Sequence, residues 1–265
     1  MSEPVLLSVE SNIATILMNR PEQGNAIDLP MARSLLSAAI ACDQDEAIHC
    51  VVLTGAGKLF CAGGDLESFV QADDEIAGFL SELAGTLHLA VSRLMRMSKP
   101  LVVLVNGAAA GAGMSLALVG DVVLAQRSST LTPAYGAIGL SPDGGLTWLL
   151  PRLIGIRRAQ EILMLNKRLS AQQASELGLI TRMVEDDELK SEGASLALSL
   201  SAMNVQATGN VKQLLLQSQH TSLETQLECE ARSLSNLSTL PFVREKVTAF
   251  VQQRFTKNNK EQRHG

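Results

Sequence analysis

The stretch that decides the fold reads Lys99-Pro-Leu-Val-Val-Leu-Val-Asn-Gly-Ala-Ala-Ala-Gly-Ala-Gly-Met-Ser-Leu-Ala-Leu118. Leu101 to Val105 is a continuous aliphatic run with the length of a buried strand, and Asn106-Gly107 ends it. Small residues from Ala108 to Val119 then predict a helix that begins at a glycine-rich turn. The unpaired backbone N–H groups of a helix start favour negative charge, so this turn can hold an oxyanion.

A second glycine-rich loop of the same type lies upstream. The strand predicted over Cys50 to Leu53 leads into Thr54-Gly-Ala-Gly-Lys-Leu-Phe-Cys-Ala-Gly-Gly-Asp65, where Asp65 is suited to cap a following helix. Strand, glycine turn and helix is a very common α/β arrangement, so either loop alone is weak support for a site. Two such loops, followed by Ser141-Pro-Asp-Gly-Gly145, are much stronger support.

Length and composition predict a soluble globular protein. The 265 residues carry a formal net charge of −5, which argues against a nucleic-acid partner. Apolar runs end before they reach membrane-spanning length, and the N-terminus lacks a signal-peptide pattern, so we expect no membrane partner and a cytoplasmic location. The four cysteines show neither metal-site spacing nor a disulfide framework, so no metal is expected.

Strand and helix patterns alternate along the first part of the chain, which indicates a layered α/β architecture. Val5 to Val9 and Ile13 to Met18 predict a hairpin, and Asp28 is suited to cap the next helix. Beyond Asp187 the pattern is helical without a strand signal. We therefore expect an α/β core over residues 1–200 and a helical region over residues 201–265.

Five motifs in this order resemble the enoyl-CoA hydratase/isomerase (crotonase) superfamily over nearly the whole chain. They are Asn19-Arg-Pro-Glu-Gln-Gly-Asn-Ala-Ile27, Val51 to Leu66, Lys99 to Gly113, Leu116 to Asp121, and Leu150 to Gly155 with Ala174 to Gly178. The resemblance implies a crotonase-like core of repeated ββα units wound in a spiral and a helical region that packs trimers, hence a homotrimer or a dimer of trimers. It also implies an acyl-CoA substrate, with coenzyme A entering only as part of that substrate and no separate cofactor.

The resemblance further implies where the substrate binds. In the family, two backbone N–H groups hold the thioester oxygen and stabilise the enolate formed at the α-carbon, and by position they belong to Gly64 and Ala112. Region 66–98 corresponds to the wall of the acyl pocket. The residues expected to contact the substrate are Ala26, Ala62, Gly63, Asp65, Leu66, Gly111, Tyr135 and Leu140.

The chain lacks the two glutamates that hydratases of the family use, and this limits the residues that could act as acid and base. Hydratases of the family activate water with two glutamates, whose positions here hold Ser115 and Tyr135. Neither side chain has the basicity of a carboxylate near neutral pH. In the isomerases of the family, including the ring-enlarging isomerases of phenylacetate breakdown, a single carboxylate follows a Gly-Leu turn, and this position is Asp143. From the local sequence alone, Asp143 is equally well explained as a helix N-cap.

The first hypothesis is therefore an enoyl-CoA isomerase in which Asp143 is catalytic together with the N–H groups of Gly64 and Ala112. A hydratase that uses Asp143 with Tyr135 and water is the first alternative. His88, twelve residues before Pro100, matches a histidine that assists hydrolysis in aryl-CoA dehalogenases, although a histidine that only packs on its helix is the simpler interpretation. Dehalogenation ranks lower because only 3% of the residues are aromatic. A non-catalytic acyl-CoA-binding scaffold is the alternative from another functional class.

Overall fold

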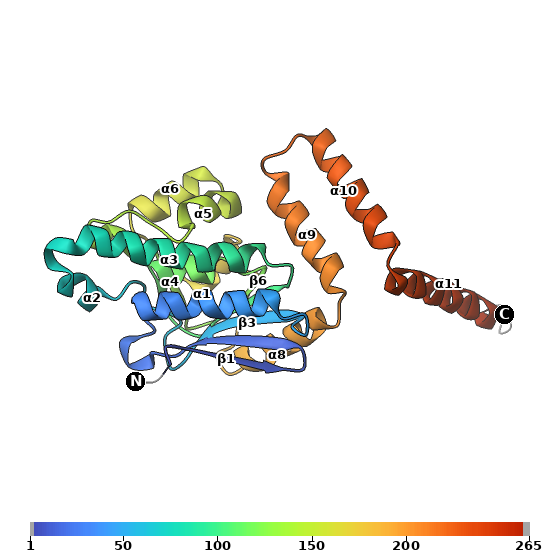
Figure 1. Ribbon diagram of the computed structural model, residues 1–265, viewed down its shortest axis with the longest axis horizontal. Coiled ribbons are helices and arrows are strands. Elements are labelled where there is room, and N and C mark those ends of the chain that lie inside the picture. Colours follow the sequence, from blue (N-terminus) through green and yellow to red (C-terminus); the bar gives the residue numbers. More distant parts are fainter. Residues whose placement is uncertain (1–2, 262–265) are drawn as a thin grey trace. The chain divides into compact units, whose positions relative to one another are not determined.

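The computed structural model describes residues 3–261, and for residues 253–261 it describes the backbone alone. The chain divides into two compact units, Met1–Val205 and Gln206–Gly265. No helix within residues 3–261 is both long and apolar enough to cross a membrane. The candidate site lies wholly in the first unit, so the arrangement of that unit is what matters for function (Figure 1).

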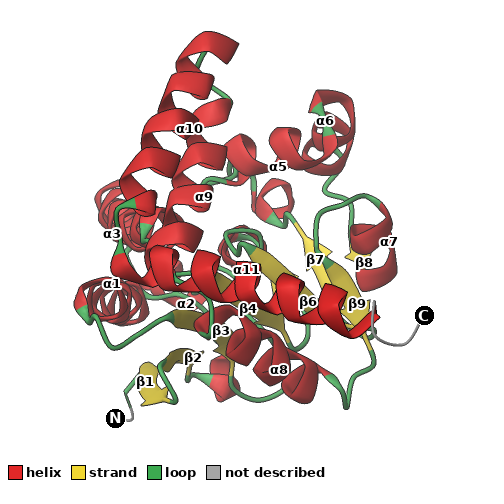
Figure 2. Ribbon diagram, turned by 90° about the vertical axis from the view of Figure 1, so that its right-hand side faces the viewer, coloured by secondary structure: helices red, strands yellow, loops and turns green. Residues whose placement is uncertain are grey.

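A six-stranded sheet forms the centre of the first unit, in the strand order β1-β2-β3-β4-β6-β9 (Figure 2). The first two strands form the expected antiparallel hairpin, and every later neighbour is parallel. The predicted strands over residues 50–53 and 101–105 are confirmed. The bounds are β1 (Val5–Glu10), β2 (Ile13–Met18), β3 (Cys50–Gly55), β4 (Leu101–Val105), β6 (Val122–Gln126) and β9 (Arg182–Val184).

Helices cover both faces of this sheet. Helix α1 (Leu29–Gln44), capped as predicted by Asp28, and helix α3 (Ile76–Arg96) lie over one face, and α8 (Leu189–Ser201) lies over the other (Figure 1). The alternate residues Ala14, Ile16 and Met18 of β2 are fully buried against α1 and the main core. The predicted amphipathic helix within residues 66–98 is therefore α3, preceded by α2 (Leu66–Gln71) and the 3-10 turn η2 (Asp73–Glu75).

A small three-stranded sheet positions the loops of the site. It consists of β5 (Ala109–Ala110), β7 (Thr130–Thr132) and β8 (Leu169–Ser170), with β7 in the middle. The helix predicted over residues 108–119 is shorter than expected, since α4 spans Ala112–Ala117. Residues 109 and 110 extend instead because they pair with β7, which is tertiary pairing that local composition does not reveal.

Shorter elements complete the first unit. The 3-10 turn η1 (Pro21–Gln23) precedes α1, and a second, η3 (Tyr135–Ile138), follows β7. Helix α7 begins at Ser170 with a complete capping box, as its sequence predicts. The remaining bounds are α5 (Leu146–Ile154), α6 (Ile156–Met164) and α7 (Ala171–Glu176).

The second unit is helical, as the sequence predicts. Its helices are α9 (Val205–Ser218), α10 (Leu223–Ser238) and α11 (Pro241–Glu261). Ser222 caps α10, and the Gln226 amide donates a hydrogen bond to the Leu214 carbonyl oxygen, which ties α10 to α9. Helix α10 has no buried residue and exposes Leu223, Leu227 and Leu234.

Candidate active site

A largely apolar cavity of about 300 Å³ lies between the two glycine-rich loops and helix α3. Asp143 is the one carboxylate among the residues that line it. Such a cavity with few polar groups is typical of a site for a small apolar ligand group. The lining residues are Ile27, Ala62, Gly63, Gly64, Leu66, Phe69, Leu80, Leu83, Ala84, Leu87, Gly111, Ala112, Ala134, Tyr135, Ile138, Leu140, Ser141 and Asp143.

The two glycine-rich loops meet through a parallel backbone bridge between Cys61 and Ala109. Gly64 and Ala112 each lie three residues beyond that bridge, so both reach the same end of the cavity. Ala112 is the first residue of α4. Within residues 3–261, neither the Gly64 nor the Ala112 N–H group has a hydrogen-bond acceptor. The structure thus brings together the two N–H groups that the sequence predicts as oxyanion donors.

Two glycines of these loops shape the site. A Cβ on Gly64 would lie 2.5 Å from Cζ of Phe69, so any larger residue would displace a wall of the cavity. Gly111 has a φ of +54°, a conformation that L side chains rarely adopt, and its N–H group donates to the Thr132 carbonyl oxygen at 3.0 Å. That turn frees the next N–H group, on Ala112, from any strand partner.

Asp143 lies in a short chain of hydrogen bonds. The Tyr135 hydroxyl donates to Asp143 Oδ1 at 2.6 Å and lies 3.3 Å from Ser115 Oγ, which donates to the Asp143 carbonyl oxygen at 2.9 Å. Burial, and then the negative charge of Asp143, raise the pKa of the Tyr135 hydroxyl above its ordinary value. Tyr135 is therefore a neutral donor that holds one carboxylate oxygen, Oδ1, and the other, Oδ2, lies near His88.

His88 contacts the turn that carries Asp143. The Gly144 N–H group donates to His88 Nε2 at 3.1 Å, so this nitrogen accepts and the ring proton is assigned to Nδ1. The same Nε2 atom lies 3.5 Å from Asp143 Oδ2. His88 therefore does more than pack on α3, although it is half-exposed and does not line the cavity.

Asp143 does not act as a helix cap. Helix α5 begins after Gly145, whose φ is +82°, and no side chain caps its first turn. The two glycines after Asp143 both adopt left-handed conformations, which moves the helix start beyond the reach of its carboxylate. Of the two interpretations that the local sequence left open, the N-cap is wrong, because the carboxylate bonds to Tyr135.

Most of the predicted contact residues lie together, but not all. Ala62, Gly63, Leu66, Gly111, Tyr135 and Leu140 line the cavity. Ala26 and Asp65 do not. The Ala26 carbonyl oxygen accepts from Arg20, and Asp65 caps α2. Of the apolar wall residues of α2 and α3, sequence reasoning named Leu66 as a site residue but none of the others, although the apolar face of α3 that includes Leu83 and Leu87 was visible in the sequence.

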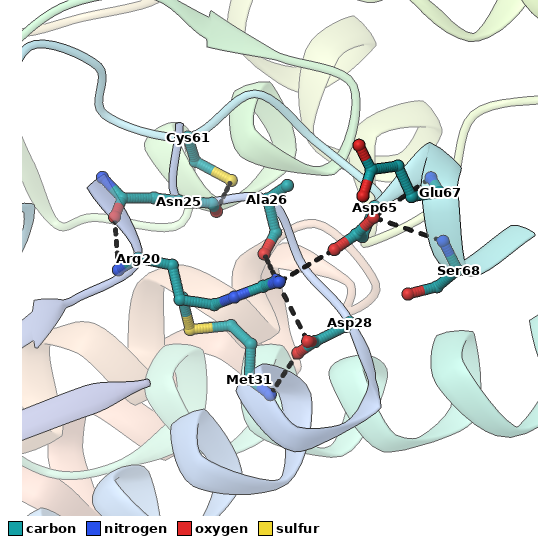
Figure 3. A network of polar contacts seen from close by, with 9 residues as sticks. All are labelled: Arg20, Asn25, Ala26, Asp28, Met31, Cys61, Asp65, Glu67 and Ser68. Atoms are coloured by element: carbon teal, nitrogen blue, oxygen red, sulfur yellow. Dashed lines mark hydrogen bonds and ion pairs between the residues drawn. The ribbon is translucent and has the colours of Figure 1, made fainter. Parts of the chain in front are cut away.

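A buried asparagine anchors the first loop (Figure 3). The Asn25 amide Nδ2 lies within hydrogen-bond distance of the carbonyl oxygens of Ala56, Leu59 and Phe60, at 2.8 to 3.1 Å. The backbone carbonyl oxygen of Asn25 accepts a hydrogen bond from the Cys61 thiol at 3.2 Å. Burial raises the pKa of that thiol to about 12, so Cys61 is a neutral packing group. Among the side chains that the structure describes, those of residues 3–252, no group of three or more His, Cys, Asp or Glu is placed to hold a metal ion.

The chain matches the family model described as enoyl-CoA hydratase/isomerase over residues 8–261. The chain belongs to the enoyl-CoA hydratase/isomerase family. The resemblance seen in the motifs is thereby confirmed, and the α/β core is a crotonase fold. The protein is an enzyme of this family.

Individual members of the enoyl-CoA hydratase/isomerase family carry different names. The chain is 37% identical to a 1,2-epoxyphenylacetyl-CoA isomerase of Escherichia coli, covering 96% of this chain and 97% of the relative. It is 30% identical to 4-chlorobenzoyl coenzyme A dehalogenase-2 of Arthrobacter sp., covering 92% and 90%. The crystal structure of an enoyl-CoA hydratase from Polaromonas sp. JS666 superposes with a TM-score of 0.90 at 31% identity, covering 94% and 97%. These names include an isomerase, a dehalogenase and a hydratase, so the names alone do not identify the reaction, and the site residues must be considered.

Proposed function

We propose that the protein is an enoyl-CoA isomerase that moves a carbon–carbon double bond of an acyl-CoA from C3 to C2. The observation that carries the proposal is the composition of the cavity, which offers one carboxylate, Asp143, and two acceptor-free N–H groups on Gly64 and Ala112. A double-bond shift needs one proton removed and one returned, so a single carboxylate suffices.

The proposed reaction starts with a 3-enoyl-CoA whose thioester oxygen accepts hydrogen bonds from the Gly64 and Ala112 N–H groups. Asp143 removes a proton from C2, the electron pair moves to the thioester oxygen, and the two N–H groups stabilise the resulting dienolate. Protonated Asp143 then returns the proton to C4, which leaves the double bond at C2. Tyr135 holds Oδ1 of Asp143, so Oδ2 is the oxygen that carries the proton.

The acyl group would occupy the apolar part of the cavity, against Phe69 of α2 and Leu80, Leu83 and Leu87 of α3. No oxidation or reduction accompanies a double-bond shift. The proposal therefore needs no redox cofactor, and coenzyme A takes part only as a portion of the substrate.

A hydratase is the second candidate function, and a specific contact favours it. The Tyr135 hydroxyl lies 2.6 Å from Asp143 Oδ1, so the two groups can hold one water molecule between them and the C2–C3 double bond. The proximity of His88 to Asp143 likewise favours the hydrolytic dehalogenase alternative, in which Asp143 attacks an aryl carbon and His88 assists hydrolysis of the ester.

Paired assays test these alternatives. The purified protein is given a 3-enoyl-CoA, a 2-enoyl-CoA and a 4-halobenzoyl-CoA, and conjugation, hydration and halide release are measured. The proposal expects conjugation of the first substrate at a rate well above hydration of the second, and no halide release. Dominant hydration or halide release would show that the isomerase assignment is wrong.

Replacing the carboxylate tests its role directly. We expect Asp143→Asn to lower kcat for isomerisation by about 10³-fold, because the amide cannot accept the substrate proton. Coenzyme A ester binding, measured by calorimetry, should be retained. The matched control is Asp187→Asn, an exposed carboxylate outside the site, which should keep full activity. An active Asp143→Asn enzyme would contradict the assignment.

We also propose a homotrimer or a dimer of trimers. The exposed leucines of α10 lie on one helix face, at spacings of four and seven residues, and an apolar stripe of this kind is typical of a protein interface. Light scattering should give three or six times the chain mass of 28.2 kDa. A monomer in solution would contradict this proposal without affecting the isomerase assignment.

A further inference from the structure

One arginine joins the starts of helices α1 and α2, of which α2 lines the cavity (Figure 3). Arg20 lies between β2 and η1, and its side chain is 19% exposed. Its Nη1 atom lies 3.1 Å from Asp28 Oδ2, and its Nη2 atom donates to Asp65 Oδ2 at 2.9 Å. Asp28 caps α1 and Asp65 caps α2. A single guanidinium therefore connects the two N-cap residues.

In both carboxylates, Oδ1 accepts from N–H groups of the helix and Oδ2 contacts Arg20. Asp28 Oδ1 accepts from the Met31 N–H group at 2.8 Å, and Asp65 Oδ1 lies 3.1 Å from the Glu67 nitrogen and 3.3 Å from that of Ser68. The Oδ2 atoms are left for Arg20. Because both oxygens are engaged, the position of Arg20 and the position of each helix start are coupled.

The backbone next to Asp65 fixes the direction of the Gly64 N–H group. The Ile27 N–H group donates to the Gly63 carbonyl oxygen at 2.7 Å, and the Asp65 N–H group donates to the Ile27 carbonyl oxygen at 3.0 Å. In such a parallel bridge, the residue between the two bonded peptides turns its own N–H group to the opposite side. Gly64 therefore presents its N–H group to the cavity.

Arg20 holds both sides of this bridge. On one side its Nη1 atom donates to the carbonyl oxygen of Ala26, the residue before Ile27, at 2.6 Å. On the other side its Nη2 atom binds the carboxylate of Asp65, the residue after Gly64. The contacts use two different nitrogens of one planar group, a geometry that the single ammonium of lysine does not reproduce.

We propose that Arg20 is a positioning residue for the oxyanion site, because it holds the Gly64 N–H group where the thioester oxygen binds. This inference rests on the proposed function for the identity of Gly64 as a donor. Arg20 does not line the cavity and touches no substrate. Asp65, which the sequence suggested as a contact residue, acts in this scheme through its neighbour Gly64.

The carbonyl group of a bound thioester reports on this geometry without any reaction. The probe is butyryl-CoA, a saturated ester, isotopically labelled at the thioester carbonyl carbon, and the measurement is its carbonyl stretching frequency by difference infrared spectroscopy. In the wild-type protein, hydrogen bonds to the oxygen should lower this frequency. Arg20→Met should lose more than half of that shift, while the dissociation constant changes by less than about threefold.

Kinetics give the second readout. Misplacing a reacting group by about 1 Å can cost on the order of 10² in rate, so we expect kcat of Arg20→Met to fall by roughly that factor with little change in KM. Arg20→Lys should show most of the same loss. The matched control is Arg127→Met, which removes an exposed arginine paired with Glu185 at the ends of β6 and β9. This variant should match the wild type in both readouts.

A milder variant keeps the test decisive if Arg20→Met fails to fold. Asp28→Asn retains a good N-cap for α1 but weakens one anchor of Arg20. It should lose part of the carbonyl shift in the folded protein. A full carbonyl shift and unchanged kcat in both Arg20→Lys and Asp28→Asn would overturn the proposal.

Failure of this inference is distinguishable from failure of the proposed function. If wild-type protein shifts the butyryl-CoA carbonyl but does not isomerise 3-enoyl-CoA, the isomerase assignment is wrong and the Arg20 result stands. If wild-type protein binds butyryl-CoA with no carbonyl shift, Gly64 is no oxyanion donor and the role of Arg20 is wrong as well.

Discussion

The two loops that present the proposed oxyanion donors are held in different ways. The first, residues 56–65, is fixed by polar side chains, since Asn25 binds its carbonyl oxygens and Arg20 binds Asp65. The second, residues 107–113, is fixed by close backbone contact. A Cβ on Gly113 would lie 2.2 Å from the Cys61 carbonyl oxygen, and one on Gly107 would lie 2.0 Å from that of Lys58.

The positions of the two loops therefore depend on different kinds of contact. Charged and amide groups determine where the first loop lies, so its geometry depends on a small number of hydrogen bonds. The second loop lies where it does because glycines let its backbone approach and pair with the first loop, so its geometry depends on shape and on backbone hydrogen bonds. The second loop also continues into α4, whose Ser115 contacts the carboxylate side of the site, whereas the first loop has no such link.

The largest effect is expected where the two loops make one of their closest backbone contacts. Gly113→Ala would force the Cys61 carbonyl away, and overpacking of this kind typically costs about 1–3 kcal/mol and occasionally more. We expect a lower free energy of unfolding in urea and a loss of most isomerase activity. Wild-type stability in Gly113→Ala would refute the idea that contact with Cys61 positions the second loop.

The matched control for that change is Gly85→Ala. Gly85 is an exposed residue inside α3, with nothing within 4 Å of an added Cβ. Because alanine in a helix interior is favoured over glycine by about 0.5–1 kcal/mol, this variant should be slightly more stable than wild type and equally active.

A smaller effect is expected from removing a single donor in the second loop. Ala112 is the first residue of α4, a position where proline is tolerated, so Ala112→Pro deletes the N–H group with little damage to the helix. Loss of one oxyanion donor costs about 10²–10³ in kcat. Ala112→Gly, which keeps the N–H group, should stay within about threefold of wild type. Equal rates for the two variants would exclude Ala112 as a donor.

The smallest effect is expected at Tyr135, which only holds the carboxylate. Tyr135→Phe removes the 2.6 Å hydrogen bond to Asp143 and should lower kcat by roughly tenfold, since a hydrogen bond to a charged group is worth about 1.5–3 kcal/mol. The measurement is the rate at which the wild type and Tyr135→Phe conjugate a 3-enoyl-CoA. An unchanged rate would mean that Asp143 needs no support from the α4 side of the site.

Tyr135 also makes the stability of the folded protein depend on pH. Because the folded-state pKa of Tyr135 is raised, the neutral phenol is favoured by folding, so its contribution to stability is complete below the unfolded pKa of about 10 and is lost as pH rises above that value. The chain has one tyrosine, so phenolate absorbance reports Tyr135 alone. Ionisation of the native protein should require a higher pH than ionisation of the urea-denatured protein. Coincident titration curves would contradict the buried contact with Asp143.

Much of the fold could be predicted from the sequence because its signals are local. The β1–β2 hairpin, the strands over residues 50–53 and 101–105, and the caps at Asp28, Asp65 and Ser170 depend on a few neighbouring residues and were correct. The errors occurred where distant segments decide the local structure. Residues 109 and 110 joined a small sheet, and the helix after Asp143 began two residues late.

The site was predictable in part for the same reason. The two glycine-rich loops and the turn around Asp143 each have a local signature, and the structure brings all three to one cavity. The contact between Arg20 and Asp65 that supports the first loop has no local signature, because the two residues are forty-five positions apart in the sequence. Both residues stood inside the motifs that carried the resemblance, which was the available signal, but no spacing rule links them. The contact between His88 and the Asp143 turn also arises only from packing of α3.

If backbone N–H groups serve as the oxyanion donors, as proposed, this has a consequence for evolution. A codon change alters a side chain but almost never removes a peptide N–H group, so mutation rarely deletes the means of stabilising an enolate. Ser115, Tyr135 and Asp143, in contrast, are ordinary side chains, each open to single substitutions. A lineage with this scaffold can therefore change the reaction it catalyses through point mutations while the stabilisation shared by all those reactions is inherited intact.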